Sequence, residues 1–276
     1  MKIESAQDSE SFKNFEHQGW ETVSAGYEQH FARLTGQAVP ATLEAVGLTK
    51  GMRLLDVCTG PAMLAGAAVE KGADVIGLDF SDEAIDIARR NVPQAEFRQG
   101  DAQDLPFEAG SFDAVVCGYG IIHVPEPEKA LSEVHRVLRS GGRFATSVWE
   151  APKPTNGLGL LFGSIKNHGS LDVPLPHGPD IFQFSDDEKM TSALRHTGFS
   201  EITVQTIGQV WDFDEPLGLV NAVMEGMVRA RGLFLAQTDS ARGAIAEAVR
   251  QGMEQYRSAK GDYRVPMPAV LGAGTK

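Results

Sequence analysis

The chain has 276 residues, of which 42% are hydrophobic and 22% are charged, and its formal net charge at pH 7 is −12. This length and composition predict a soluble globular protein with a large core. The acidic balance and the lack of clustered lysines and arginines argue against a nucleic-acid partner, because phosphate binding requires concentrated positive charge.

Two cysteines, Cys58 and Cys117, lie far apart in the sequence. Neither has a second Cys or a His at metal-ligand spacing, so we expect neither a zinc site nor a disulfide framework. Residues 1–12 are polar and acidic and lack the apolar segment of a signal peptide. No apolar run is long enough to span a membrane. These features predict a cytoplasmic protein without a membrane span.

The chain divides into three expected regions. Residues 1–45 are expected to be mainly helical and to pack as an N-terminal lid. Residues 46–150 alternate short apolar runs with amphipathic segments, which predicts strands and helices in turn. The strands are expected at 52–58, 73–80, 95–102, 112–120 and 143–150, and the helices at 62–72, 81–91 and 127–142.

Repeated strand–helix–strand units require right-handed crossovers, which predicts a parallel sheet with helices on both faces. Ligands of such sheets bind beyond the carboxyl ends of the strands. The segments that end near Asp56, Asp79, Asp101 and Tyr119 should therefore surround the site.

The third region, 151–276, is expected to complete the sheet and to add a helical cap. Pro266 and Pro268 lack ladder donors, which predicts an edge position or an antiparallel neighbour for the last strand. The expected elements are helices at 158–169 and 185–199, a long strand at 201–213, two helices between 216 and 260, and a last strand at 262–276.

The loop after the first strand reads "DVCTGPA" from Asp56 to Ala62. Dinucleotide-binding folds place G-x-G-x-x-G here so that a pyrophosphate can bind at a helix N-terminus. This loop lacks that pattern and begins with a carboxylate, which would repel a pyrophosphate but attract an ammonium. It therefore favours S-adenosylmethionine (SAM), which carries an ammonium and a cationic sulfur, over NAD.

These residues make the chain similar to the class I SAM-dependent methyltransferases, in particular the small-molecule group related to the ubiquinone and menaquinone C-methyltransferases. The first motif of that family is D-x-G-x-G-x-G, from which "DVCTGPA" departs at Cys58 and Ala62. Later segments, "GLDFS", "GDAQDLPF", "FDAVVCGYGIIHV" and "ALSEVHRVLRSGGRF", match further family features in order. The resemblance covers residues 20–150 most clearly.

The resemblance implies a doubly wound, seven-stranded, mostly parallel Rossmann-like sheet with a helical N-terminal lid and a helical cap. It also implies roles for residues around the cofactor. Asp79 would accept both ribose hydroxyls, Phe80 would lie beside the adenine, and Asp101 and the backbone of Ala102 would bind the adenine ring. The other expected cofactor-binding residues are Tyr27, Asp56, Cys58, Thr59, Gly60, Pro61, Gln103 and Cys117.

Cys58 stands where the family has glycine. A glycine there allows a positive φ, which Cys adopts only with strain. Because Cys is small, a loop with a negative φ at this position would accept it. We expect Cys58 to be a tolerated small residue without a redox or catalytic role.

His123 is the leading candidate for a catalytic base, since it follows the fourth strand, where the acceptor should meet the methyl group. It could instead shape the loop. Tyr119 either lines the acceptor pocket or ends a buried strand, and His135 is expected to be structural. His168, His177 and His196 have no companion acids at metal-ligand spacing, so we expect no metal site.

We therefore expect a metal-independent transfer of a methyl group from SAM to a small, apolar or aromatic acceptor. The segments 156–180 and 216–237 of the cap are rich in Leu, Phe and Met and should select that acceptor. A non-catalytic SAM-binding module of the same fold is the main alternative. A monomer or a homodimer would fit either interpretation.

Overall fold

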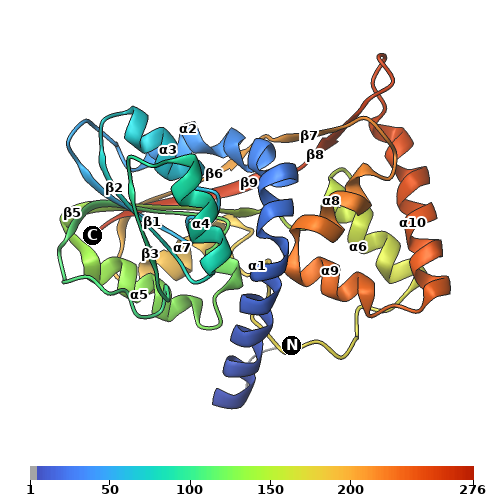
Figure 1. Ribbon diagram of the computed structural model, residues 1–276, viewed down its shortest axis with the longest axis horizontal. Coiled ribbons are helices and arrows are strands. Elements are labelled where there is room, and N and C mark those ends of the chain that lie inside the picture. The colour runs from blue at the N-terminus through green and yellow to red at the C-terminus, as the bar shows by residue number, and fades with distance from the viewer. Residues whose placement is uncertain (1–4) are drawn as a thin grey trace.

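A computed structural model describes residues 5–276, so residues 1–4 of the expected lid lie outside the described part. The strands form a seven-stranded sheet in the order β3-β2-β1-β4-β5-β9-β6 and a two-stranded ribbon of β7 and β8 (Figure 1). In the seven-stranded sheet β9 alone runs opposite to the other strands, so its pairings with β5 and β6 are antiparallel and the other pairings are parallel. The predicted fold class, a doubly wound and mostly parallel seven-stranded sheet, is confirmed. The strands are β1 (Arg53–Val57), β2 (Asp74–Asp79), β3 (Glu96–Gln99), β4 (Phe112–Gly118), β5 (Leu138–Trp149), β6 (Ser200–Ile207), β7 (Val210–Phe213), β8 (Tyr263–Pro266) and β9 (Ala269–Thr275).

Helices cover both faces of the sheet. Side chains of α2, α3 and α4 pack in one buried cluster with Leu54 and Val116, and those of α5 and α7 pack in another with Leu55 and Val115. Neighbouring residues of a strand thus point to opposite faces, and both faces are buried. The helices are α1 (Ala6–Thr35), η1 (Gly36–Ala38), α2 (Val39–Ala45), α3 (Met63–Glu70), α4 (Asp82–Asn91), η2 (Ile121–His123), α5 (Pro127–Val137), α6 (Gly157–His168), α7 (Asp187–His196), α8 (Gly218–Gly226), α9 (Val228–Leu235), α10 (Asp239–Met253) and η3 (Glu254–Tyr256).

Local sequence explains the ends of α4. The Ser81 hydroxyl accepts a hydrogen bond from the backbone N–H of Ala84 at 3.1 Å, which caps the first turn. Acidic residues lie in the first turn and Arg89 and Arg90 in the last, so both ends complement the helix dipole. The helix therefore begins and ends where the sequence predicts.

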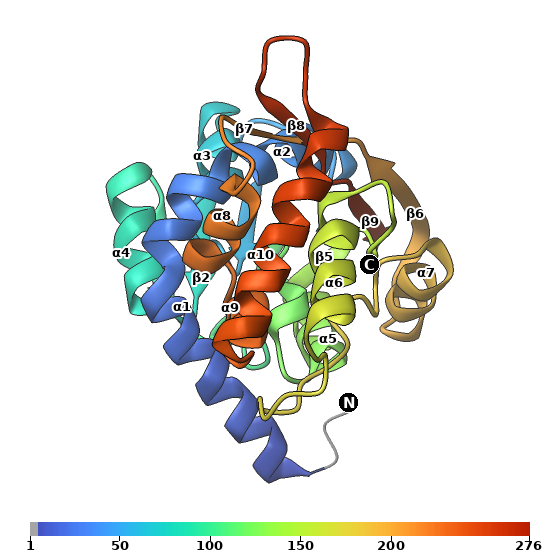
Figure 2. The same ribbon diagram turned by 90° about the vertical axis from the view of Figure 1, so that its right-hand side faces the viewer.

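Four helices, α6, α8, α9 and α10, form a unit beside the sheet that we call the cap. Figure 1 shows the long helix α1 between the sheet and the cap, and the ribbon of β7 and β8 joining the two. Within the cap, α10 lies along α6 (Figure 2). α1 contacts α8 and α9 of the cap as well as α4 on the sheet side. The division of the chain at residues 45 and 150 stays a prediction.

Three expectations for the third region are wrong. The expected single strand at 201–213 is two strands, because the chain leaves the sheet after β6 and pairs with β8 as β7. The expected last strand is also two strands; β9 lies between β5 and β6, and of the two positions predicted for it, at an edge or antiparallel, the antiparallel one is confirmed. Three α-helices, not two, lie between residues 216 and 260. The alternation of apolar and polar residues cannot show where the chain passes from the seven-stranded sheet to the two-stranded ribbon, because a strand has one side more buried than the other in either place.

The helix expected at 127–142 ends earlier, at Val137. Leu138 is already extended, with φ −70° and ψ 140°, and begins β5. The glycines that follow therefore lie within the first part of the strand, where Gly141 has a φ of 74°. They form a turn-like start to β5 rather than the end of the helix.

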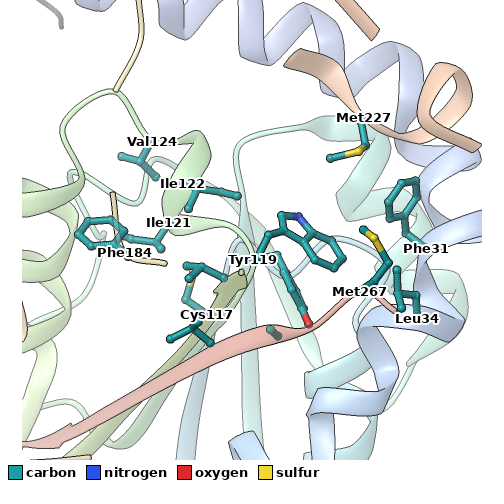
Figure 3. Close-up of a cluster of buried hydrophobic side chains, with 14 of the residues drawn as sticks. Phe31, Leu34, Cys117, Tyr119, Ile121, Ile122, Val124, Phe184, Met227 and Met267 are labelled. Atoms are coloured by element: carbon teal, nitrogen blue, oxygen red, sulfur yellow. The ribbon is translucent and has the colours of Figure 1, made fainter. Parts of the chain in front are cut away.

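The buried core joins distant parts of the chain. Figure 3 shows Phe31 and Leu34 of α1 in one cluster with Tyr119, which follows β4, and Met267, which precedes β9. Among residues 5–276 we find no helix both long and apolar enough to cross a membrane. The core thus fixes α1 over the carboxyl ends of the strands.

Candidate functional site

The loop after β1 turns sharply at two non-glycine residues. Cys58 has a φ of 55° and Ala62 a φ of 65°, both in the left-handed region, and Gly60 between them has a φ of 51°. The expectation that Cys58 is accepted at a negative φ is therefore wrong. Both positions at which the loop departs from the family's glycine pattern keep a glycine-like backbone, which is strained for other residues.

Gly120 leaves room for the Cys58 side chain. A Cβ at residue 120 would lie 2.2 Å from the Cβ and 2.8 Å from the Sγ of Cys58, and 3.2 Å from the Sγ of Cys117. The two sulfurs thus flank the same glycine. A hydrogen bond with Cys117 and then burial raise the pKa of the Cys58 thiol well above its usual range. Cys58 therefore stays a neutral thiol at neutral pH, which makes it a poor nucleophile.

Asp56 stabilises the loop after β1 through hydrogen bonds. One of its oxygens, Oδ2, accepts hydrogen bonds from Thr59 Oγ1 at 2.8 Å and from the backbone N–H of Ala65, in the first turn of α3, at 3.1 Å. Burial raises the pKa of Asp56 to about 7, the hydrogen bonds of Thr59 and Ala65 lower it, and nearby Asp79 raises it further. A cation bound at this loop would favour the ionised form.

Asp79 ends β2 beside that loop. Its Oδ2 accepts from the backbone N–H of Gly60 at 2.9 Å and its Oδ1 from that of Ser81 at 3.1 Å. Burial raises the pKa of this carboxyl, and the hydrogen bonds of Gly60 and Ser81 partly offset the rise. A buried carboxylate at a strand end is suited to accept hydrogen bonds from the hydroxyl groups of a ligand.

Asp101 is engaged from two sides. Its Oδ2 accepts from Lys13 Nζ at 2.7 Å and its Oδ1 from the backbone N–H of Gln103 at 2.8 Å. Burial raises the pKa of Asp101, but the hydrogen bonds and charge of Lys13, together with Gln103, lower it more, so the net pKa lies below its usual range. Lys13 belongs to α1 and escaped the sequence analysis.

These residues border one cavity over the carboxyl ends of β1, β2 and β4. Its empty volume, including the part open to solvent, is about 1470 Å³. The expected site residues that line it are Tyr27, Asp56, Cys58, Thr59, Gly60, Pro61, Asp79, Phe80, Asp101, Ala102, Gln103, Tyr119 and His123. Cys117 is buried and does not line it. The roles of these residues stay predictions.

Aromatic side chains form another part of the cavity wall. Tyr27 stacks on Phe31 with ring centroids 5.2 Å apart, and Trp20 meets Tyr27 edge-on at 5.4 Å. Tyr119 lies 4.3 Å from Trp149, and its hydroxyl donates to Gln209 Oε1 at 2.8 Å. Burial raises the pKa of Tyr27 to about 12 and that of Tyr119 still further. Both phenols are therefore neutral at physiological pH.

A second, largely apolar cavity of about 860 Å³ adjoins the first on the cap side. Leu158 and Phe162 of α6 and Leu233 of α9 line it. Both cavities share five residues as common wall, namely Trp149, Ile181, Met227, Arg229 and Ala230. An apolar extension of a ligand in the first cavity could therefore reach the second.

A buried ionic cluster lies where α1, η2 and α9 meet. Glu16 is 0% exposed, and its Oε2 lies 3.0 Å from His123 Nδ1 and accepts from Trp20 Nε1 at 3.2 Å. Arg229 Nε lies 3.9 Å from Glu16 Oε1. The sequence offered one signal for Glu16, because it falls on the same helical face as Phe12 and Trp20, where an acid is unexpected.

Of the other histidines, His177 lines the second cavity, and His135 lines neither cavity. His135 meets Phe199 edge-on with ring centroids 5.1 Å apart. Within residues 5–276 no three His, Cys, Asp or Glu side chains are grouped so that they could hold a metal ion.

Comparisons with known proteins match the segment that carries the cofactor loop. A family model described as "Methyltransferase domain" matches residues 55–146. A demethylmenaquinone methyltransferase from Clavibacter sepedonicus is 39% identical over 176 residues, which cover 59% of this chain and 71% of that protein. One from Renibacterium salmoninarum is 36% identical over 132 residues, covering 48% of this chain and 53% of that protein. The chain thus spans about half the length of the second relative.

Solved structures show the same fold at lower identity. The YcgJ protein from Bacillus subtilis has a TM-score of 0.57 and 20% identity, covering 87% of this chain and 97% of that one. Phosphoethanolamine N-methyltransferase 2 from Haemonchus contortus, with phosphomonomethylethanolamine and S-adenosylhomocysteine, also has a TM-score of 0.57 and 20% identity, covering 96% of this chain and 60% of that one. At this identity the likeness shows the fold alone.

Proposed function

The chain belongs to the class I SAM-dependent methyltransferases, and we propose that it transfers a methyl group from SAM to a small, apolar or aromatic acceptor without a metal ion. The observation that carries this proposal is one cavity with two unlike walls. Acidic strand ends form one wall, and aromatic side chains of α1, of β5 and of the segment after β4 form the other.

The acidic wall fits the cofactor. Asp79 would accept the ribose hydroxyls, Asp101 and the backbone of Ala102 would bind the adenine beside Phe80, and the loop above Asp56 would hold the methionine end. These acids suit a cation, whereas a pyrophosphate would meet two buried carboxyls. When bound, SAM supplies an electrophilic methyl group.

The aromatic wall fits the acceptor. Trp20, Tyr119 and Trp149 offer flat apolar surfaces against which a ring could stack. The second cavity continues this wall into the cap, which is the part of the chain best placed to distinguish acceptors. The protein's main tasks would be to align the acceptor and to exclude water.

A hydroquinone is the finer candidate that we propose for the acceptor. Two observations favour it: similar proteins are named demethylmenaquinone methyltransferases, and the second cavity offers space for an apolar substituent. A simple phenol would use the first cavity alone.

Calorimetric titration with SAM, S-adenosylhomocysteine and NAD tests the cofactor. We expect binding of the first two, lost in Asp79→Ala and retained in the matched variant Asp74→Ala at the exposed start of β2. Preference for NAD would overturn the proposal.

Turnover with SAM across phenols, hydroquinones and amines tests the reaction, in the presence and absence of EDTA. We expect methylation of a phenol or hydroquinone that EDTA does not abolish. Binding of SAM without turnover of any acceptor would instead support the alternative, a non-catalytic SAM-binding module.

A further inference from the structure

Glu16 is a carboxylate in an unusual place. It lies on α1 with 0% exposure, beside His123 and Trp20, which line the cavity. Burying a carboxylate costs several kcal/mol unless charge and hydrogen bonds compensate. Glu16 does not itself line the cavity, so it can act on the site only through the residues that it contacts, His123 above all.

Arg229 supplies the compensating charge from the cap. Its Nε lies 3.9 Å from Glu16 Oε1, and its Nη2 donates to the carbonyl of Pro179 at 2.9 Å. Arg229 also lies over the ring of Phe12, 5.2 Å from its centroid. The guanidinium thus places a positive charge beside the Glu16 carboxyl group.

The contact with Glu16 fixes the position of the proton on its neighbour His123. A carboxylate can only accept hydrogen bonds, so Nδ1 of a neutral His123 must carry the proton that it shares with Glu16 Oε2 at 3.0 Å. The lone pair of His123 then lies on Nε2. The side chain of His123 is 15% exposed and lines the cavity, and within residues 5–276 no hydrogen bond occupies Nε2.

We propose that Glu16 is a positioning residue that holds His123 as the proton acceptor of the reaction, so that the methyl acceptor is a protic group such as a phenol or hydroquinone hydroxyl. This inference rests on the proposed methyl transfer. The O–H bond of the acceptor breaks, its proton moves to Nε2 of His123, and the electron pair stays on the acceptor. That pair forms the new bond to the methyl carbon, while the pair of the methyl–sulfur bond stays on sulfur.

The proton position can be read without any turnover. Nitrogen-15 NMR of histidine-labelled protein distinguishes a protonated ring nitrogen from one with a lone pair, and His123→Asn identifies the signals of residue 123. We expect the proton on Nδ1 in the wild type. In Glu16→Gln the amide oxygen should turn to Arg229 and the amide NH₂ to Nδ1, which moves the proton to Nε2. A wild-type proton on Nε2 would overturn the proposal.

Kinetics with phenols of graded acidity test the catalytic consequence. General-base catalysis typically contributes about 10²-fold or more, so we expect Glu16→Gln to lower kcat about 10²-fold for a weakly acidic phenol, with KM nearly unchanged. For a nitrophenol that is already ionised at the assay pH, no base is needed and the loss should shrink to a fewfold.

Glu10→Gln is the matched control, because it removes an exposed carboxyl from the same helix. It should leave unchanged the position of the proton on His123, kcat, and the dependence of kcat on the acidity of the phenol. An equal loss in Glu16→Gln for all phenols would indicate a merely structural role and overturn the proposal. If the wild type binds SAM but methylates no acceptor, the proposed methyl transfer itself is overturned. This outcome differs from a failure of the Glu16 proposal, because the wild type and both variants would then all lack turnover.

Discussion

Cys58 and Ala62 hold glycine-like backbone conformations without being glycine. The left-handed region costs other residues about 1–2 kcal/mol, and the greater freedom of glycine in the unfolded chain returns part of this. We expect Cys58→Gly and Ala62→Gly each to raise the free energy of unfolding by about 0.5–1 kcal/mol, measured with urea. Cys58→Gly should bind SAM within severalfold of the wild type.

Gly47→Ala is the comparison for which we expect the opposite change in the free energy of unfolding. Gly47 has a φ of 61° and open space around its added Cβ, so only backbone strain should result. We expect it to lower the free energy of unfolding by about 1 kcal/mol. If Cys58→Gly and Gly47→Ala changed stability in the same direction, the backbone explanation would fail.

Asp56 should make stability depend on pH. Because its pKa in the folded chain is about 7 and the unfolded value is about 4, the folded chain keeps a proton that the unfolded chain releases. Its stabilising contribution is complete below about pH 4 and is lost as the pH rises to 7. We expect the wild type to lose a few kcal/mol relative to Asp56→Asn between pH 5 and pH 8, measured by urea unfolding without SAM.

Asp74→Asn is the control for this experiment, since it removes an exposed carboxyl at the start of β2. Its stability difference from the wild type should stay nearly constant over the same pH range. A constant difference for Asp56→Asn as well would contradict the argument.

Residues near motifs were predictable, and residues brought in by packing were not. Asp56, Asp79 and Asp101 line one cavity because the carboxyl ends of parallel strands meet at one edge. Glu16 and Arg229 lie more than 200 positions apart in the sequence, so their pairing depends on how α1 and the cap dock. No spacing rule links two such residues.

At the scale of elements, α1 approaches the cap through glycines. A Cβ on Gly26 would lie 2.0 Å from the carbonyl oxygen of Glu225 in α8. Gly26→Ala must push the two helices apart, and overpacking of this kind typically costs about 1–3 kcal/mol. We expect that loss in the free energy of unfolding, with weaker SAM binding because α1 lines the cavity.

Gly243→Ala makes the same chemical change in an exposed part of α10. An added Cβ there meets nothing within 4 Å, so only helix propensity acts. It should raise the free energy of unfolding by about 0.5–1 kcal/mol. A loss of stability in both variants would show that glycine flexibility, not the contact with Glu225, matters at position 26.

Element types in residues 46–150 were predictable because strands buried on both faces and capped helices leave clear local signals. The point between β6 and β7 at which the chain leaves the seven-stranded sheet was not predictable. It depends on Gln209, which is 1% exposed and binds two distant groups, the Tyr119 hydroxyl and the carbonyl of Leu34, both at 2.8 Å. Such partners exist only after folding.

For the whole molecule, Gln209 joins α1, the end of β4 and the ribbon that leads to the cap. Gln209→Leu removes both hydrogen bonds from a buried place and leaves polar groups without partners, which typically costs about 1–3 kcal/mol. We expect that loss of stability by urea unfolding. Gln37→Leu breaks two similar bonds to Val210 at an exposed position and should cost less than half as much. Equal losses would argue against burial as the cause.

The place of β9 has a consequence for the order in which the chain is made. β5 and β6 both pair with β9, and β9 follows every other strand in the sequence. During synthesis, the edges of β5 and β6 that pair with β9 therefore have unpaired backbone groups until residues 269–275 have left the ribosome. Open edges are templates for pairing with other chains. Until β9 is made, β5 and β6 thus remain open to pairing with other chains, and the addition of β9 closes the sheet between them.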